Sequence, residues 1–415
     1  MPAENDASRP TFREALRFWV KLGFISFGGP TGQIAIMHTE LVERRKWISE
    51  ERFLHALNFC MLLPGPEAQQ LATYIGWRLH GIRGGIAAGA LFVIPSIFIL
   101  LALSWVYATH GNVPWVAAIF FGLKPAVMAI VAHAVIRIGT KALKTPVRWA
   151  LAAGAFVAIY FFKVPFPVII GAAALIGGMR SIASVASPAA TTERGPPLSR
   201  ALKVVVVCLV LWWTPVLLLG MMRGWDSVFV KQGTFFSKAA MVTFGGAYAV
   251  LPYVAQASVE HFHWLSAPQM MDGLGLAETT PGPLIMVLQF VGFMGGWNAG
   301  GLGSAVICAL LTTWVTFVPC FLWIFLGAPY VDRLYGNAKL NAVLSAVTAA
   351  VVGVILNLAV WFGVRTLLPE GGPVNRFAAA VGLVAFAGMW RWKWGVVPVV
   401  LGAGVLGLIY HVATR

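Results

Sequence analysis

Charged residues are scarce in this sequence, and acidic residues are scarcer than basic ones. Only 11% of the 415 residues are charged, against about 25% in typical soluble domains, and 59% are hydrophobic. The mean hydropathy is +0.80. A water-soluble fold of this length could not bury so large an apolar fraction, so the composition excludes an ordinary soluble domain and indicates a membrane protein.

Several common functional signatures are also missing. There is no glycine-rich phosphate loop and no HExxH motif, which argues against an ATP-driven pump and a membrane protease. We find no haem, flavin or cluster motif. We therefore expect no enzyme activity, no cofactor and no metal. The four cysteines show no CxxC spacing and lie in or beside apolar stretches, so we interpret them as core residues: Cys60, Cys208, Cys308 and Cys320.

Long uncharged runs dominate what is present. Residues 85–108 and 340–363 each contain no charge and are long enough to cross a hydrocarbon core of about 30 Å as a helix. The net charge of +15 does not indicate nucleic-acid binding, because the basic residues sit in short clusters between apolar runs. Such clusters are typical of the loops of membrane proteins. We therefore expect lipid, and no nucleic acid, around this chain.

The chain contains an internal repeat. With a shift of 217 positions, Pro64-Gly65-Pro66 aligns with Pro281-Gly282-Pro283, and a GG pair aligns with a second GG pair. The full matched set around the GG pairs is Lys21, Ser26, Phe27, Gly28 and Gly29 with Lys238, Thr243, Phe244, Gly245 and Gly246. We therefore predict an N-terminal repeat at 1–180, a linker and connecting span at 181–222, and a C-terminal repeat at 223–415.

The apolar segments predict an all-α polytopic membrane protein. Nine segments are interpreted as full spans: 85–108, 114–136, 147–162, 165–180, 202–222, 298–327, 340–362, 374–390 and 395–411. Four more are interrupted near the middle: 12–36, 50–79, 232–256 and 268–294. A single connecting span joins the two repeats. Because an odd number of membrane crossings separates them, the second repeat should be inverted relative to the first.

Basic residues agree with this inversion. Residues 1–84 carry ten Lys or Arg, whereas the matching window 218–301 carries three. By the positive-inside rule, the N-terminus should be cytoplasmic and the C-terminus outside. Inverted repeats are a common architecture of secondary transporters, whose substrate site lies where the repeats meet.

The four interruptions are FGGP at 27–30, FGGA at 244–247 and the two PGP motifs. Glycine and proline favour helix breaks, and a break is tolerated in a membrane where it is buried or lines a cavity. The following helices would direct N–H groups into the mid-membrane, where they suit an anion. Kinks for close packing remain the alternative. The charge pattern favours re-entrant hairpins over single full spans.

Polar residues beside these breaks are candidate substrate ligands. Lys21 and Lys238 could attract a dianion or only extend their ammonium groups to the interface. Ser26 and Thr243 could donate to an oxyanion or bond their own helix carbonyls. Lys124 is a further candidate, as a partner or a substrate contact. The complete predicted binding set adds Gly28, Gly29, Pro30, Pro64, Gly65, Pro66, Gln69, Gly245, Gly246, Thr280, Pro281, Gly282 and Pro283.

Two acidic residues lie beside the PGP motifs. Glu67 follows the first motif, and Glu278 precedes the second. A carboxyl group at membrane depth is costly, so each is a candidate proton carrier. Each could instead pair with a nearby Arg or Lys for structural reasons.

The stretches FISFGGPTGQIAIMHTELVERRKWISEERF and LLPGPEAQQLATYIGWRLHGIRGG resemble the chromate ion transporter family, in its long two-domain form. The resemblance covers nearly the whole chain. It implies a bacterial inner-membrane protein that exports chromate from the cytoplasm and confers chromate resistance, and it leaves a homodimer open. The second copy departs from the first in having Ala247 where the first has Pro30, which puts a fourth helix-start site in question.

Substrate alternatives stay open at this point. A sulfate or related oxyanion carrier would need the same donors, and an anion channel would carry the same ions without saturation. Moving one charge through 100 mV is worth about 2.3 kcal/mol, so a dianion leaving a negative interior gains about 4.6 kcal/mol. Export therefore needs no proton coupling.

Replacing Glu67 with Gln tests whether this residue couples protons to transport. If it does, Glu67→Gln should lower chromate flux and remove pH dependence from it, because the amide cannot carry a proton. Flux in vesicles across a range of pH checks this. A normal rate with a normal pH dependence would exclude coupling through Glu67.

Overall fold

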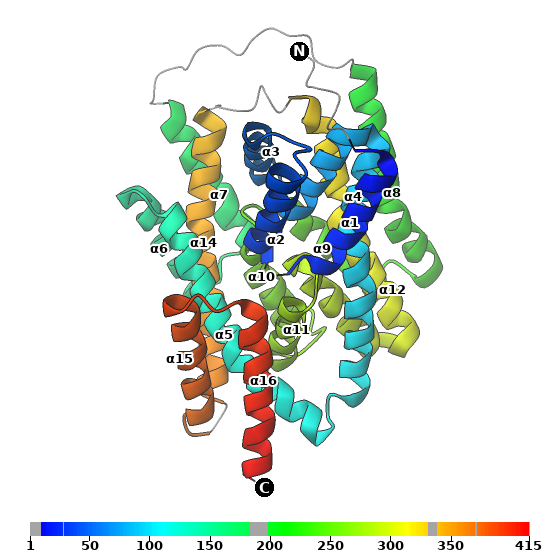
Figure 1. Cartoon of the computed structure of the whole chain (residues 1–415). Coiled ribbons are helices and arrows are strands. Elements are labelled where there is room, and N and C mark those ends of the chain that lie inside the picture. The colour runs from blue at the N-terminus through cyan, green and yellow to red at the C-terminus, as the bar shows by residue number, and fades with distance from the viewer. Residues whose placement is uncertain (1–9, 28, 183–197, 331–337, 370–371, 415) are drawn as a thin grey trace.

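The computed structural model describes residues 10–27, 29–182, 198–330, 338–369 and 372–414; Gly28 and residues 183–197 of the predicted linker and connecting span lie outside these ranges. Within them every regular element is a helix (Figure 1), as the sequence predicts. Six helices in this part of the chain are long and apolar enough to cross a membrane: α4 (Glu67–His110), α5 (Pro114–Ala142), α8 (Leu198–Arg223), α12 (Val287–Gly327), α14 (Ala338–Leu367) and α16 (Val396–Ala413).

Three of the nine predicted spans are shorter helices. α6 (Pro146–Tyr160), α7 (Phe166–Ile182) and α15 (Arg376–Arg391) have 15, 17 and 16 residues. At about 1.5 Å per residue, each of these helices is shorter than the thickness of a hydrocarbon core, which is about 30 Å. The count of nine full spans is therefore not confirmed. Hydropathy alone did not reveal this for α6 and α7, because they are as apolar as the long helices.

The first half opens with three short helices, α1 (Phe12–Ile25), α2 (Gly29–His38) and α3 (Glu50–Leu62). In Figure 1, α1 runs from the upper end to the middle of the molecule, α2 returns upward, and α3 lies at that upper end. α4 then bends at His80 and Gly81, where the backbone angles are not helical. Its first part closes a hairpin with α3, and its second part is the long span that reaches the lower end.

The second half repeats this order with α9 (Val228–Met241), α10 (Ala247–Gln256), α11 (Ala267–Thr279) and α12. α12 bends at Gly300 and Gly301, as α4 does at its own non-helical pair. A π-helical turn extends both α2 and α10, over Thr39–Arg44 and Ala257–His261. α11 and the first part of α12 are almost fully buried and form the centre of the hydrophobic core.

All four predicted interruptions are helix breaks. α2 begins at Gly29, α4 at Glu67 and α10 at Ala247, and a 3-10 turn at Leu284–Met286 leads into α12. The PGP turns require glycine, since Gly65 and Gly282 have φ of +126° and +100°. Helix starts therefore follow directly on the breaks, as the sequence predicts.

The breaks of the two halves hydrogen-bond to each other reciprocally. The Gly65 N–H donates to the Thr243 carbonyl at 2.7 Å, and the Gly282 N–H donates to the Ser26 carbonyl at 2.7 Å. Under the 217-residue shift these two bonds are equivalent. Gln33 Nε2 adds a bond to the Gly282 carbonyl at 2.5 Å. Each PGP turn is thus satisfied by the other half of the chain.

The halves also exchange their peripheral helices. α15 and α16, from the second half, pack on α5 of the first half, while α6 and α7 pack on α14 of the second. Small residues permit this close approach: Gly122 of α5 lies against Gly407 of α16, and Gly177 of α7 lies against Ala346 of α14. The two halves therefore share one hydrophobic core.

Gly282→Ala should destabilise the fold by about 1–3 kcal/mol, because Ala resists a positive φ and its methyl group would collide with Ser96. Gly154→Ala is a matched control: Gly154 lies within α6 with nothing within 4 Å of an added Cβ. Thermal unfolding of the purified protein in detergent measures both. Equal unfolding temperatures for the two variants would contradict a requirement for glycine in the PGP turn.

Candidate functional site

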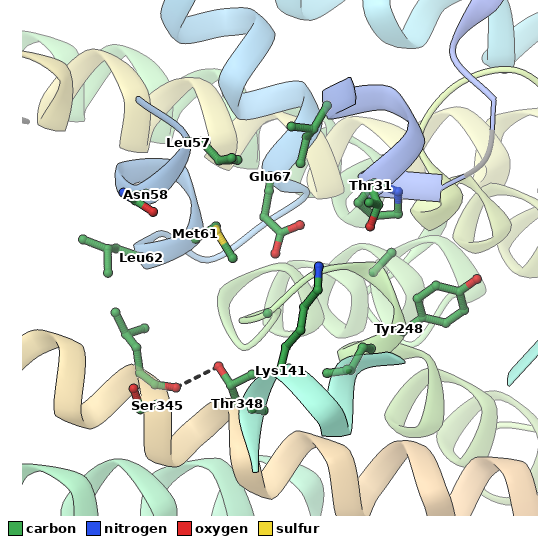
Figure 2. A pocket seen from close by; sticks show the side chains of 18 of the residues that line it. Thr31, Leu57, Asn58, Met61, Leu62, Glu67, Lys141, Tyr248, Ser345 and Thr348 are labelled. Carbon is green, nitrogen blue, oxygen red and sulfur yellow. Dashed lines mark hydrogen bonds between the residues drawn. The ribbon is translucent and has the colours of Figure 1, made fainter. Parts of the chain in front are cut away.

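A cavity of about 780 Å³ lies between the two halves. Its walls are the starts of α2, α4, α6, α10 and α14, the end of α5 and one face of α3 (Figure 2). Its volume falls within the range of about 300–1,000 Å³ typical of small-molecule sites. Both repeats thus contribute to one cavity, as expected for a site between repeats.

The cavity wall is strongly basic. Arg137 and Lys141 reach it from the last two turns of α5, and Arg148 reaches it from the first turn of α6. His55 of α3 also lines it. Glu67 is the acidic residue among the lining residues. The excess of positive charge in a partly dehydrated space favours an anionic ligand.

Glu67 projects into this basic space from the first residue of α4. Figure 2 shows its carboxylate and the Lys141 ammonium pointing toward one another across the cavity. The carboxylate also lies beside the start of α10, since a Cβ built on Gly246 would be 3.2 Å from Glu67 Oε2. The protein therefore places its own carboxylate where a helix start and a lysine would attract an external anion.

Two of the helix starts in the cavity wall follow the glycine-rich breaks. Pro30 and Thr31 lie in the first turn of α2, and Gly245, Gly246 and Ala247 lead into α10. α10 begins at Ala247 with Gly246 as its N-cap at φ +91°, so this helix starts here without a proline. The unpaired N–H groups and positive dipole end of such a start favour an anion. Further hydrogen-bonding side chains in the wall are Asn58, Asn341, Ser345 and Thr348.

Glu278 lies behind the cavity wall. The Tyr248 hydroxyl donates to Glu278 Oε1 at 2.5 Å, and Tyr248 is one of the residues that line the cavity. In Figure 2 this hydroxyl points away from the cavity centre. The two candidate proton carriers therefore differ: Glu67 faces the cavity directly, and Glu278 is one side chain removed from it.

Four of the sequence-predicted site residues line the cavity, namely Pro30, Glu67, Gly245 and Gly246. Gly28 lies outside the described residues. The others lie elsewhere around the breaks, and their part in binding stays a prediction.

The two lysines of the predicted set lie outside the cavity wall. Lys21 Nζ is 3.7 Å from Glu40 Oε1, and the Lys21 side chain is 53% exposed. Burial alone would raise the pKa of Glu40, but Lys21, together with hydrogen bonds from Arg45 and Arg44, outweighs it and holds this pKa below its usual value. Lys238 is exposed on α9. The structure thus gives Lys21 an internal partner.

The two hydroxyl residues bond their own helices. Ser26 Oγ donates to the Leu22 carbonyl and Thr243 Oγ1 to the Ala239 carbonyl, each at 2.6 Å. Thr280 likewise donates to the Ala277 carbonyl at 3.2 Å. Gln69 is fully buried, and its amide has no hydrogen-bond partner within the described structure. The remaining predicted residues build the turns themselves: Gly29, Pro64, Gly65, Pro66, Pro281, Gly282 and Pro283.

Arg137, Lys141 and Arg148 are not among the predicted ligands, because they follow the predicted span 114–136, where a cluster of basic residues is typical of a loop. A usable signal was present: Arg137 and Lys141 are four residues apart, which puts both on one face of a helix. Among the described residues, no group of three or more His, Cys, Asp or Glu residues could hold a metal ion.

Comparison with known proteins finds a matching family. The family model described as chromate transporter matches residues 13–178 and 230–408. The chain belongs to the chromate transporter family. The two matches begin 217 residues apart, the offset of the internal repeat, so the chain has the long, two-domain form of this family. No solved structure matches the chain.

Relatives in this family cover almost the full chain. A chromate transport protein of Cupriavidus metallidurans is 30% identical over 97% of this chain and 94% of its own length. One of Pseudomonas aeruginosa is 32% identical, covering 94% of this chain and 90% of its own length. A probable chromate transport protein of Synechococcus elongatus is 28% identical over 92% of this chain and 90% of its own length. This family is one of multi-pass membrane transporters rather than enzymes.

Arg137→Gln and Lys141→Gln should each weaken chromate binding by about 10- to 100-fold, since a hydrogen bond to a charged group contributes about 1.5–3 kcal/mol. Lys21→Gln is the matched control and should change affinity by less than about twofold, because Lys21 pairs with Glu40. Calorimetric titration of the purified protein with chromate measures all three. A larger loss in Lys21→Gln than in the cavity variants would show that the binding site lies elsewhere.

Proposed function

We propose that this protein is a secondary transporter that exports chromate, a tetrahedral oxyanion, from the cytoplasm and so confers chromate resistance. The observation that carries this proposal is the basic cavity between the repeats, where Arg137, Lys141 and Arg148 share one space with the N-termini of α2 and α10. The relatives named chromate transport proteins support the substrate.

The donor set suits such a substrate. All oxygens of a tetrahedral dianion accept hydrogen bonds, and the cavity offers ammonium, guanidinium, hydroxyl and amide donors. Arginine can bind two oxygens at once, and helix starts add backbone N–H groups. A cavity of about 780 Å³ is larger than one such ion, so bound water would accompany it.

Glu67 gives this site a route to proton coupling. As an ionised carboxylate it repels an incoming dianion and competes with it for the start of α10 and for Lys141. Protonation would remove that competition. We therefore propose Glu67 as the first proton carrier and Glu278, which is reached through Tyr248, as the second.

We further propose that the halves are inverted repeats, 1–180 and 223–415, joined through 181–222, in the bacterial inner membrane. Two equivalent reciprocal hydrogen bonds between the breaks support a two-fold relation. In Figure 1, α1 begins at the upper end and α16 finishes at the lower end. With the basic first repeat on the cytoplasmic side, the N-terminus is inside, the C-terminus is outside, and the cavity beside α3 faces the cytoplasm.

Chromate flux in proteoliposomes at set voltage and pH gradients tests this proposal. We expect saturable chromate efflux from the cytoplasmic side, driven by about 4.6 kcal/mol per dianion at 100 mV. Liposomes with Arg137→Gln/Lys141→Gln protein are the control. Unsaturable conductance would identify an anion channel. Sulfate transported in preference to chromate would assign a sulfate carrier instead.

A further inference from the structure

Two helix pairs of the molecule, α3 with α14 and α11 with α5, are equivalent in the repeat. α3 and α11 match over their full lengths at the 217-residue shift. α14 begins 224 residues after α5, and the two helices occupy equivalent places in the exchanged packing. The α3–α14 side and the α5–α11 side are therefore repeats of one another.

The α3–α14 side is open. His55 and Asn58 of α3 face the cavity, as do Ser345 and Thr348 of α14. Figure 2 shows Asn58 on one side of the space and Ser345 and Thr348 on the other. α3 is partly exposed along this face, and Met61 is 49% exposed.

The α5–α11 side is closed. α11 packs along α5, and a Cβ built on Gly275, the counterpart of Asn58, would lie 3.7 Å from Leu123 Cβ and 3.3 Å from Val127 Cγ2. Asp272, the counterpart of His55, is only 3% exposed. Where the first side has a cavity, the equivalent second side has a packed seam.

A polar cluster lies within this seam. The Tyr107 hydroxyl of α4 donates to Asp272 Oδ2 at 2.8 Å. Lys124 Nζ of α5 lies 3.9 Å from Asp272 Oδ1, which has no hydrogen-bond partner within the described structure. Lys124 is the counterpart of Thr348, so the pair Lys124 and Asp272 corresponds to Thr348 and His55 across the open cavity.

We propose that the α5–α11 seam is the second passage of the transport cycle and that Lys124, Asp272 and Tyr107 form its gate. This inference rests on the proposed transport function. In the closed state, Asp272 depends on Lys124 and Tyr107 for compensation, because a buried carboxylate without partners is costly. Opening the seam would admit water to both charges. The gate is therefore compatible with two states, one paired and dry, the other separated and hydrated.

The same cluster links opening to the substrate. An oxyanion that arrives at Lys124 offers this ammonium a second anionic partner and so competes with Asp272. A dianion attracts it more strongly than a single carboxylate does. Lys124 then contacts the substrate in the passage, and Asp272 pairs with the Lys124 ammonium when no substrate is present.

A disulfide across the seam tests the proposal. The Cβ separation of 3.7 Å at positions 123 and 275 fits a disulfide. In Leu123→Cys/Gly275→Cys protein, oxidation should lower chromate flux at least tenfold, and reductant should restore it. The two single variants, and the native chain with its four buried cysteines, should keep their flux after oxidation.

Chromate binding separates failure of the gate from failure of the proposed function. Oxidised Leu123→Cys/Gly275→Cys protein should still bind chromate, because the open cavity is untouched. A quantitative disulfide with unchanged flux would overturn the gate and leave the transport function intact. Absence of chromate binding in native and variant protein alike would overturn the proposed function itself.

Asp272→Asn provides a second, independent test. Loss of the charge should weaken the closed state, so the Leu123→Cys/Gly275→Cys pair should oxidise at least threefold more slowly when Asp272→Asn is added. Chromate binding by the Asp272→Asn protein reports that it is folded. An unchanged oxidation rate in folded protein would show that Asp272 serves packing alone.

Discussion

Backbone amides and carbonyls at the helix breaks are the groups that this fold must satisfy, because hydrocarbon offers them no water. The structure does so by bonding each Pro-Gly-Pro turn to the break in the opposite half: Gly65 to the Thr243 carbonyl, and Gly282 to the Ser26 carbonyl. The duplication supplies equivalent partners for both bonds. The remaining architecture, including the hairpins and the cavity, follows from bringing these two turns together.

This constraint also leads to the site. Once the breaks meet at the centre, the starts of α2 and α10 and the carboxylate of Glu67 fall into one space. The end of α5 then brings Arg137 and Lys141 to the same place. The cations and the start of α2 come from the first half, whereas the start of α10 comes from the second half. The cavity is thus formed by contact between the two halves.

Much of this could be predicted from the sequence, because the glycine and proline motifs and their constant 217-residue shift are visible in the residues themselves. The four breaks, the helix starts after them and the duplicated order were all available from the residues. The partners of side chains could not be predicted, since no local sequence pattern indicates that Lys21 pairs with Glu40 or that Ser26 donates to a carbonyl of its own helix. Helix length was also mispredicted, because α6 and α7 are as apolar as full spans and yet shorter. Arg137 and Lys141 could not be recognised as cavity residues, because a cationic helix end and a cytoplasmic loop have the same composition.

The exchange of peripheral helices has a consequence for how the chain is made. α5 emerges from the ribosome early, but α15 and α16, the helices that cover it, follow only after most of the second half has been synthesised. Until then the small-residue face of α5 at Gly122 must rest against lipid or the insertion machinery. The first half therefore reaches its final packing only after these helices of the second half have been made, and α16 completes a structure that α1 began.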